Sequence, residues 1–181
     1  LRMAKGDEIV VCDGEETEYT CVLEDFLSDC VVAKIVSSAR SKAEPSFEAH
    51  LYQALPKGDK LDQIIQKAVE LGVSEIGVFS SEFSSAYMNA NKLERLNKVS
   101  KEAAKQCLRS FAPEIVYYDT LDKALDAALD YKNKLFACEF ATGSDVEIGE
   151  ICGDTAIVIG SEGGFSREEA ERAKEKGFAH L

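Results

Sequence analysis

The stretch AIVIGSEGGFSREEAERAKEKGF, residues 156–178, places four apolar residues directly before a glycine-rich bend and a helix start signal. A short apolar run of this kind is typical of a strand buried on both faces of a parallel sheet. Ser166 and Glu169 have the S-x-x-E spacing of a capping box, which satisfies two amides of the first helical turn and leaves the others free to face a ligand. The stretch predicts a strand, a bend at 160–165 and a helix at 166–176.

The chain upstream of this bend alternates between strand and helix patterns. Asp59 is expected to cap the first helix and Gly72 to end it in a left-handed conformation. Such alternation predicts a mostly parallel sheet with helices on both faces. The pattern predicts strands at 47–55, 74–81, 114–118, 134–140 and 155–160, helices at 59–71, 91–109, 120–129 and 166–176, and an irregular segment at 141–153.

The first part of the chain has a different rhythm. Short strand-like pieces rich in Val, Ile, Thr, Tyr and Phe fill 7–36, and Asp13-Gly14 is a tight-turn signal. The polar stretch 37–46 contains Pro45 and reads as a linker. We therefore expect a small antiparallel barrel or sheet with its linker at 1–46 and an α/β domain at 47–181.

Composition excludes several classes of protein. No run of 18 apolar residues exists, so no membrane span is expected, and the N-terminus lacks a signal-peptide core. The six cysteines form no C-x-x-C pair and only two histidines accompany them, so we expect no metal site. Reduced thiols beside apolar residues favour a cytoplasmic protein.

Charge is unevenly distributed along the chain. The net charge of −12 argues against a general nucleic-acid coat protein. Residues 89–110, however, hold six Lys or Arg against two Glu. This basic segment suits a selective contact with a polyanion, and a solvated helix face is the alternative.

The bend at 160–165 limits the ligands that it could hold. Open parallel sheets bind ligands beyond the carboxyl ends of their strands. The bend has no Lys for a phosphate-binding P-loop, and G-x-x-G-G after the last strand does not match a dinucleotide fingerprint. Glycines allow close backbone approach and positive φ. The ligand class that remains is a nucleoside-type ligand held by backbone hydrogen bonds. A tight turn that binds no ligand is the alternative.

Three segments together carry a family resemblance. LYQALPKGDKLDQIIQKAVELGVSEIGVFSSE (51–82), KLERLNKVSKEAAKQCLRSFAPEI (92–115) and IVIGSEGGFSREEAERAKEKGF (157–178) resemble the ribosomal RNA small subunit methyltransferase E family in order and spacing. LRMAKGDEIVVCDG (1–14) resembles the PUA-like barrel of that family. The resemblance implies a SPOUT-type trefoil-knot α/β methyltransferase domain with a mostly parallel sheet, preceded by a small PUA-like β-barrel module.

The resemblance also implies an activity. Family members transfer a methyl group from S-adenosyl-L-methionine to N3 of a uridine in 16S rRNA of the 30S subunit, and they resemble homodimers in which both subunits build each site. Two other classes stay open at this point. One is a non-catalytic RNA-binding or ribosome-assembly protein that keeps the fold, and the other is a nucleotide-dependent oxidoreductase.

The resemblance carries roles to individual residues. Arg109 matches a family arginine and is expected to bind the target nucleotide or stabilise its charge; a helix C-terminal arginine is the alternative. Glu162 is the second catalytic candidate, and it is expected either to orient the bend or to accept a hydrogen bond from cofactor or base; a carboxylate that only complements the charge of the helix N-terminus is the alternative. The expected cofactor-binding residues are Glu139, Phe140, Ile159, Gly160, Ser161, Glu162, Gly163 and Gly164, with strand-end packing the alternative for the first two. The expected RNA-binding residues are Lys57, Lys60, Lys98, Lys101, Lys105 and Arg109, with solvated turn lysines the alternative for the first two.

The chain departs from the family pattern at several positions. Phe83 stands where the family has the arginine of S-E-R-S, Leu108 where glycine is common, and Ser161 where proline is frequent. The family barrel begins before Leu1 and the family domain continues beyond Leu181. The resemblance therefore implies a chain that is incomplete at both ends.

Overall fold

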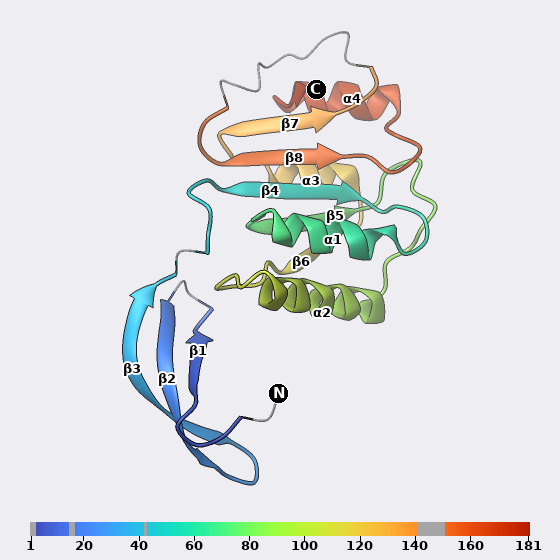
Figure 1. Cartoon of the computed structure of the whole chain (residues 1–181). Coiled ribbons are helices and arrows are strands. Elements are labelled where there is room, and N and C mark those ends of the chain that lie inside the picture. The colour runs from blue at the N-terminus through green and yellow to red at the C-terminus, as the bar shows by residue number, and fades with distance from the viewer. Residues whose placement is uncertain (1–2, 15–16, 42, 141–150) are drawn as a thin grey trace.

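The computed structural model describes residues 3–14, 17–41, 43–140 and 151–181. Most of the segment 141–153, which was predicted to be irregular, lies outside these residues. The elements form two sheets joined by a short connection (Figure 1). In chain order they are β1 (Glu8–Cys12), β2 (Thr17–Phe26), β3 (Val31–Arg40), β4 (Ala49–Ala54), α1 (Lys60–Glu70), β5 (Glu75–Phe79), α2 (Ala90–Gln106), β6 (Ile115–Tyr118), α3 (Leu121–Ala127), β7 (Asn133–Ala137), β8 (Thr155–Ile159), α4 (Arg167–Glu175) and β9 (Ala179–His180).

The larger sheet has the strand order β6-β5-β4-β8-β7-β9, and every pairing in it is parallel. The parallel α/β sheet predicted from the sequence is therefore confirmed. The two-residue strand β9 was not predicted; it extends the sheet beyond β7, where Leu181 N donates to Phe136 O at 3.0 Å. Because all strands run the same way, their carboxyl ends share one edge (Figure 1, right).

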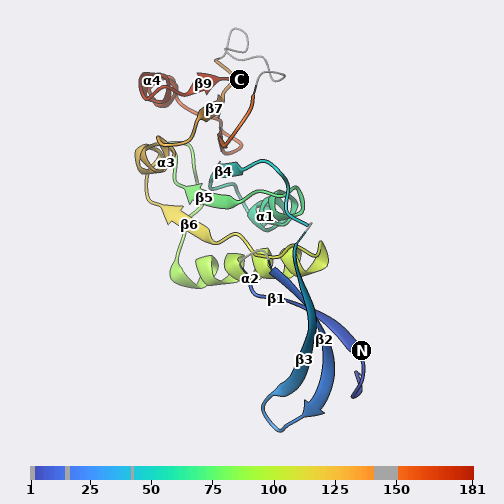
Figure 2. The ribbon, with the colours of Figure 1, turned by 90° about the vertical axis from the view of Figure 1, so that its left-hand side faces the viewer.

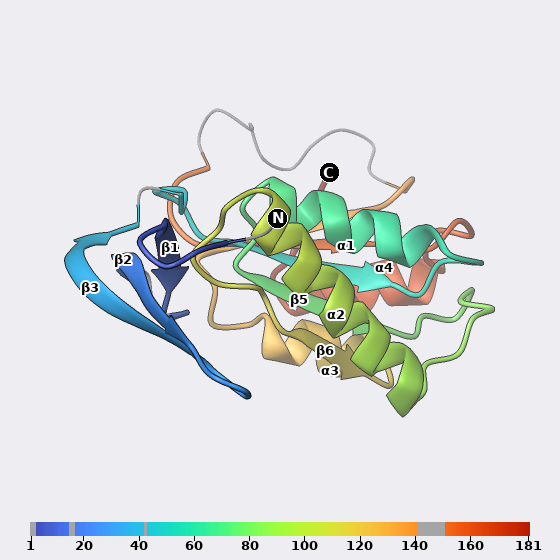
Figure 3. The same ribbon diagram turned by 60° about the horizontal axis from the view of Figure 1, so that its bottom comes forward.

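Two apolar clusters cover the two faces of this sheet. On β4, Leu51 faces α1 and α2, where it joins Leu61, Ile65 and Leu96. The next residue, Tyr52, faces α3 and α4 and joins the cluster that contains Phe136. This alternation follows from the two-residue period of a strand, and burial of both faces explains the apolar runs. Figures 2 and 3 show the helices on the two sides of the sheet.

Helix ends agree with the sequence at some positions and differ at others. Ser166 caps α4 in a capping box with its N3 residue, as predicted. Gly72, at φ +92°, follows α1 in the left-handed conformation predicted for it. The predicted side-chain cap of Asp59 is wrong: Asp59 occupies the N-cap position of α1, but at φ −99° and ψ 10° its side chain makes no capping hydrogen bond. An extended N-cap backbone is what normally aims the side chain at the first-turn amides.

The N-terminal module is an antiparallel sheet in the order β1-β2-β3. The antiparallel pairing predicted for this part is confirmed, but β3 continues to Arg40, so the first residues of the predicted linker 37–46 belong to a strand. Within the described residues, the sheet buries Cys21 and Leu23 while its apolar Val10 stays largely exposed. The strongly bent strands project from the α/β domain (Figure 3).

Within the described ranges, no helix has both the length and the apolar character needed to cross a bilayer.

Candidate active site at the carboxyl edge of the parallel sheet

Four connections meet at the carboxyl edge of the larger sheet. They follow β4, β5, β7 and β8, which lie side by side in the sheet. In open α/β sheets this edge is where ligands bind, because the connections there diverge and expose backbone groups. The bend 160–165, the connection after β8, is the centre of the edge.

The bend is a tight turn closed on itself. Gly164 N donates to Ser161 O at 3.0 Å, and the two residues form an isolated antiparallel bridge. Gly164 has φ +66°, as expected for a glycine of this bend, whereas Gly160 and Gly163 lack a positive φ. Phe165 then enters the core, where its ring lies 4.2 Å from that of Phe136. The buried ring fixes the end of the turn.

The first glycine of the bend is held from the neighbouring strand. Gln53 is buried on β4, and its Nε2 donates to Gly160 O at 2.9 Å and to Ala54 O at 3.0 Å. Burial of an amide is tolerated when its hydrogen bonds are satisfied, as these are. Sequence reasoning missed Gln53, although one polar residue in the apolar run LYQAL was a signal for it.

Glu162 ties the bend to the connection after β4. Its Oε2 accepts from Lys57 N at 3.1 Å, and its Oε1 pairs with Lys60 Nζ at 2.7 Å. The hydrogen bond from Lys60, the backbone amide of Glu162 itself and the Lys57 amide lower the pKa of Glu162 to about 2. Glu162 is therefore ionised. Its contacts with Lys57 and Lys60 agree with the first of the two roles expected for it, which is to orient the bend.

Glu169 ties the bend to the connection after β5. Its Oε2 accepts from Ser166 N at 3.0 Å, which completes the capping box. Its Oε1 accepts from Glu82 N at 2.9 Å, and the side chain is only 2% exposed. The first contact followed from the S-x-x-E pattern, but the second joins residues 87 apart and has no local signal.

Glu139 and Phe140, which follow β7, border the other side of the bend. A β-carbon built on Gly164 would lie 2.5 Å from Oε2 of Glu139. The Phe140 ring lies 4.8 Å from the guanidinium carbon of Arg167, at the first turn of α4. The structure thus brings both residues to the bend, together with Ile159 at the end of β8. The predicted cofactor residues form one contiguous stretch of this edge.

The predicted RNA-contact lysines fall into two groups. Lys57 and Lys60 lie at the carboxyl edge through their contacts with Glu162. The other group lies on α2: Lys98 pairs with Glu94 and Lys105 with Glu102, while Lys101 lines a groove of about 870 Å³ between the end of α2 and the N-terminal sheet.

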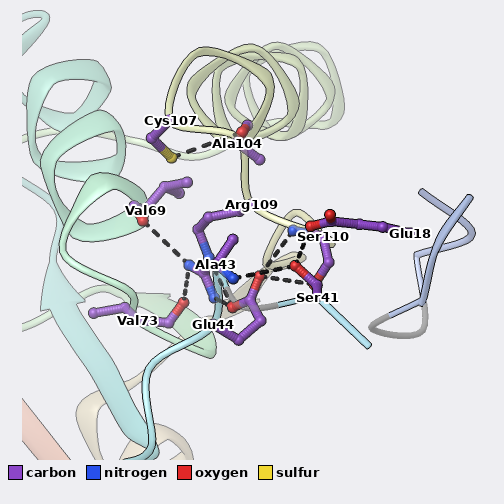
Figure 4. A network of polar contacts seen from close by, with 10 residues as sticks. All are labelled: Glu18, Ser41, Ala43, Glu44, Val69, Val73, Ala104, Cys107, Arg109 and Ser110. Atoms are coloured by element: carbon purple, nitrogen blue, oxygen red, sulfur yellow. Dashed lines mark hydrogen bonds and ion pairs between the residues drawn. The ribbon is translucent and has the colours of Figure 1, made fainter. Parts of the chain in front are cut away.

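Arg109 lies at the opposite, amino edge of the sheet. It follows α2, is 8% exposed, and donates to Val69 O at 3.2 Å and to Val73 O at 2.6 Å (Figure 4). Its Nη2 pairs with Glu44 at 2.7 Å. Val73 precedes β5 whereas Glu162 follows β8, so within one chain the structure does not bring the two predicted catalytic residues together.

Comparison with known proteins agrees with this geometry. The sequence profile described as the RNA methyltransferase domain matches residues 42–181. The Ribosomal RNA small subunit methyltransferase E of Bacillus subtilis is 30% identical over 97% of this chain and 73% of its own length. The protein of the same name from Mesomycoplasma hyopneumoniae is 32% identical over 82% of this chain, and the match spans 66% of that relative.

Solved structures show the same architecture. A methyltransferase of Legionella pneumophila with SAM bound aligns over 99% of this chain and 75% of its own, with 28% identity and a TM-score of 0.85. A Ribosomal RNA small subunit methyltransferase E of Neisseria gonorrhoeae bound to S-adenosyl methionine aligns over 98% of this chain and 75% of its own, with 25% identity and a TM-score of 0.78. The fold is thus SPOUT-type α/β, and the chain belongs to the ribosomal RNA small subunit methyltransferase E family of RNA methyltransferases.

Proposed function

We propose that this protein transfers the methyl group of S-adenosyl-L-methionine to N3 of a uridine in 16S rRNA. The observation that carries the proposal is the joined carboxyl edge. Gln53 donates to Gly160 O, Lys57 N donates to Glu162, and Glu82 N donates to Glu169 in the helix that follows the bend. The family relatives bear the name of a small-subunit rRNA methyltransferase, which supports the substrate class.

The residues present fit an adenosyl group. Three of the six residues of the bend are glycines, and a β-carbon at Gly164 would collide with the side-chain carboxylate of Glu139, so that carboxylate lies directly against the peptide backbone of the bend. We propose that residues 159–164 hold the cofactor through peptide groups, with Glu139 and Phe140 as the facing wall. A carboxylate there can accept hydrogen bonds from ribose hydroxyls.

Bound cofactor supplies a sulfonium methyl group. In the transfer the uridine N3–H bond breaks, the N3–methyl bond forms and the sulfur–methyl bond breaks, which leaves a neutral thioether and a released proton. The chain has to place N3 in line with the methyl group and stabilise negative charge on O2 and O4 of the base. Lys57, Lys60 and Arg167 are cationic residues at this edge: Lys57 N and Lys60 Nζ contact Glu162, and the Arg167 guanidinium lies over the Phe140 ring.

A homodimer would reconcile the positions of the two catalytic candidates. Since Arg109 and Glu162 lie at opposite edges of one sheet, both can serve one site only if they come from two copies. The burial of Arg109 against Glu44 favours a positioning role for it, in which it fixes the end of basic helix α2. Lys98, Lys101 and Lys105 on that helix would then contact rRNA phosphates beside the site of the other copy.

We further propose the domain division 1–46 and 47–181, with the first part a PUA-like module. The connection between them carries Glu44, whose contacts to Arg109 and Ser110 hold this connection at the end of α2.

The test uses 30S subunits from a strain that lacks its own uridine-N3 methyltransferase. Incubation with the protein and S-adenosylmethionine, followed by nuclease digestion and mass spectrometry, should yield 3-methyluridine in 16S rRNA. Binding of the subunits without methyl transfer would instead favour the non-catalytic RNA-binding alternative. Whether or not a methyl group is transferred, Lys101→Ala should reduce the slope of log affinity for the 30S subunit against log salt concentration by about one unit.

A further inference from the structure

Phe83 stands beside the bend with its side chain half exposed. It lies in the connection after β5 and is 47% exposed. A β-carbon built on Gly163 would lie 2.8 Å from Cβ of Phe83, so the base of the Phe83 side chain packs against the backbone of Gly163. The same connection is tied to α4 through Glu82 and Glu169. Phe83 therefore sits at the border of the proposed active site.

The connection that presents Phe83 is held in a fixed turn. Ser84 N donates to Ser81 O at 3.0 Å, and Ser81 N donates to Ser84 Oγ at 3.1 Å. With the Glu82–Glu169 hydrogen bond, residues on both sides of Phe83 are anchored. An aromatic ring on an anchored segment binds a flat ligand at low entropic cost, because few rotatable bonds have to be fixed.

The ring is not part of the nearby core. Phe79, Phe136 and Phe165 are fully buried in the cluster under the bend, while Phe83 keeps nearly half its surface exposed only a few residues after β5. Lys57 and Lys60 lie at the same edge through Glu162, within the group of residues that surrounds the bend. An exposed ring and lysines at the same edge of a site are the combination that holds unpaired nucleotides, since the ring can stack on bases and the cations can contact phosphates.

We propose that Phe83 stacks on an unpaired nucleobase of the RNA substrate at the entrance of the active site. This inference rests on the proposed function, because it assigns the RNA to this edge. Stacking needs an aromatic plane and a base, whereas phosphate binding needs neither. An apolar contact with a protein partner would need only the size of the side chain.

The experiment separates these possibilities with one probe pair and three variants. Fluorescein-labelled oligouridylate and an abasic oligonucleotide of equal length and charge are titrated by anisotropy. Phe83→Leu keeps the contact with Gly163 but removes the aromatic plane, and Phe83→Tyr restores a plane. Phe47→Leu is the matched control, because Phe47 precedes β4 at the amino edge and is 53% exposed.

We expect Phe83→Leu to weaken oligouridylate binding by about 5- to 150-fold and to leave binding of the abasic probe unchanged. Phe83→Tyr and Phe47→Leu should bind both probes like the unaltered protein, and S-adenosylhomocysteine affinity should not change in any variant. Equal loss on both probes, or no loss on either, would overturn the stacking role. Should the base-dependent loss appear in a protein that transfers no methyl group to 30S subunits, the stacking role would stand and the proposed function would fall.

Discussion

A buried ion pair between Arg109 and Glu44 ties the connection between the two sheets to the end of helix α2. Nε and Nη2 of Arg109 donate to one carboxylate oxygen of Glu44, at 3.1 and 2.7 Å, and the other oxygen accepts two hydrogen bonds from Ser110 (Figure 4). The two side chains are 3% and 10% exposed. The guanidinium that the resemblance assigned to RNA is thus occupied by a carboxylate of the same chain.

Removal of Glu44 should destabilise the protein strongly. Glu44→Ala leaves the Arg109 guanidinium buried without its counter-ion, and loss of one partner of a buried pair costs about 3–5 kcal/mol. Urea unfolding should show this loss, while Glu102→Ala, which breaks an exposed pair with Lys105, should change the unfolding free energy by less than about 1 kcal/mol. Similar small effects of both substitutions would mean that the buried pair contributes little to the stability of the fold.

Gly164 can be tested against a glycine of the same conformation. Gly164 and Gly58 have φ +66° and +64°, but a β-carbon at Gly58 meets nothing within 4 Å, whereas at Gly164 it meets the Glu139 carboxylate. Both alanine variants therefore carry the same left-handed penalty of about 1–2 kcal/mol. Gly164→Ala should additionally weaken S-adenosylhomocysteine binding by at least about tenfold in calorimetric titration. Equal affinities of the two variants would contradict the placement of the cofactor.

His50 should make stability depend on pH. It is buried, its ring stacks on Tyr131 at 3.9 Å, and neither ring nitrogen has a hydrogen-bond partner in the described part of the chain. Burial lowers the pKa of His50 below its usual 6.5, although Glu75, Glu48 and Asp154 oppose the shift. As the pH falls, His50 is therefore protonated in the unfolded chain before it is protonated in the folded protein. The stability that is present above about pH 6.5 is lost as the pH falls below that value.

The matching variant is His50→Phe, which keeps the ring and removes the titration. Unfolding free energies of the two proteins, measured in urea at several pH values, should diverge below pH 6.5 by at most about 1.4 kcal/mol per pH unit. The variant should be the less sensitive to acid. Parallel curves for both proteins would show that His50 is protonated equally in the folded and unfolded states.

Leu108 occupies a conformation suited to glycine. Its φ is +60° and it is 76% exposed, so the position gains little from the leucine side chain while the backbone is strained. Leu108→Gly should raise the unfolding free energy by about 1 kcal/mol. Leu71, 75% exposed at φ −81°, is the control, and Leu71→Gly should lower it by a similar amount. A lower unfolding free energy for Leu108→Gly would contradict the claim that the backbone is strained at Leu108.

The sequence predicted what depends on local pattern. Strands, helices and the parallel sheet followed from apolar periodicity, and the Ser166–Glu169 capping box followed from spacing within one turn. The departure noted at Leu108 also had a local cause, since a position that favours glycine requires a positive φ. These features need no knowledge of what lies far away in the chain.

Contacts between distant segments could not be predicted in this way. Gln53 with Gly160, Glu82 with Glu169, and Glu44 with Arg109 join residues 107, 87 and 65 positions apart. A charged residue shows that a partner is needed but not which one, so the sequence predicts an RNA contact for Arg109 and gives no sign of its buried ion pair with Glu44. Similarly, the two-residue strand β9 is too short to show any periodicity. It forms because it pairs with the edge of β7.

The most direct test of the cofactor site is amide hydrogen exchange with and without S-adenosylhomocysteine. If the peptide groups of the bend hold the adenosyl group, ligand should slow exchange at 159–165 and at 138–140, with little change in the N-terminal sheet. Protection confined to the groove between α2 and that sheet, with unchanged exchange at 159–165, would contradict the assignment of the cofactor to this bend.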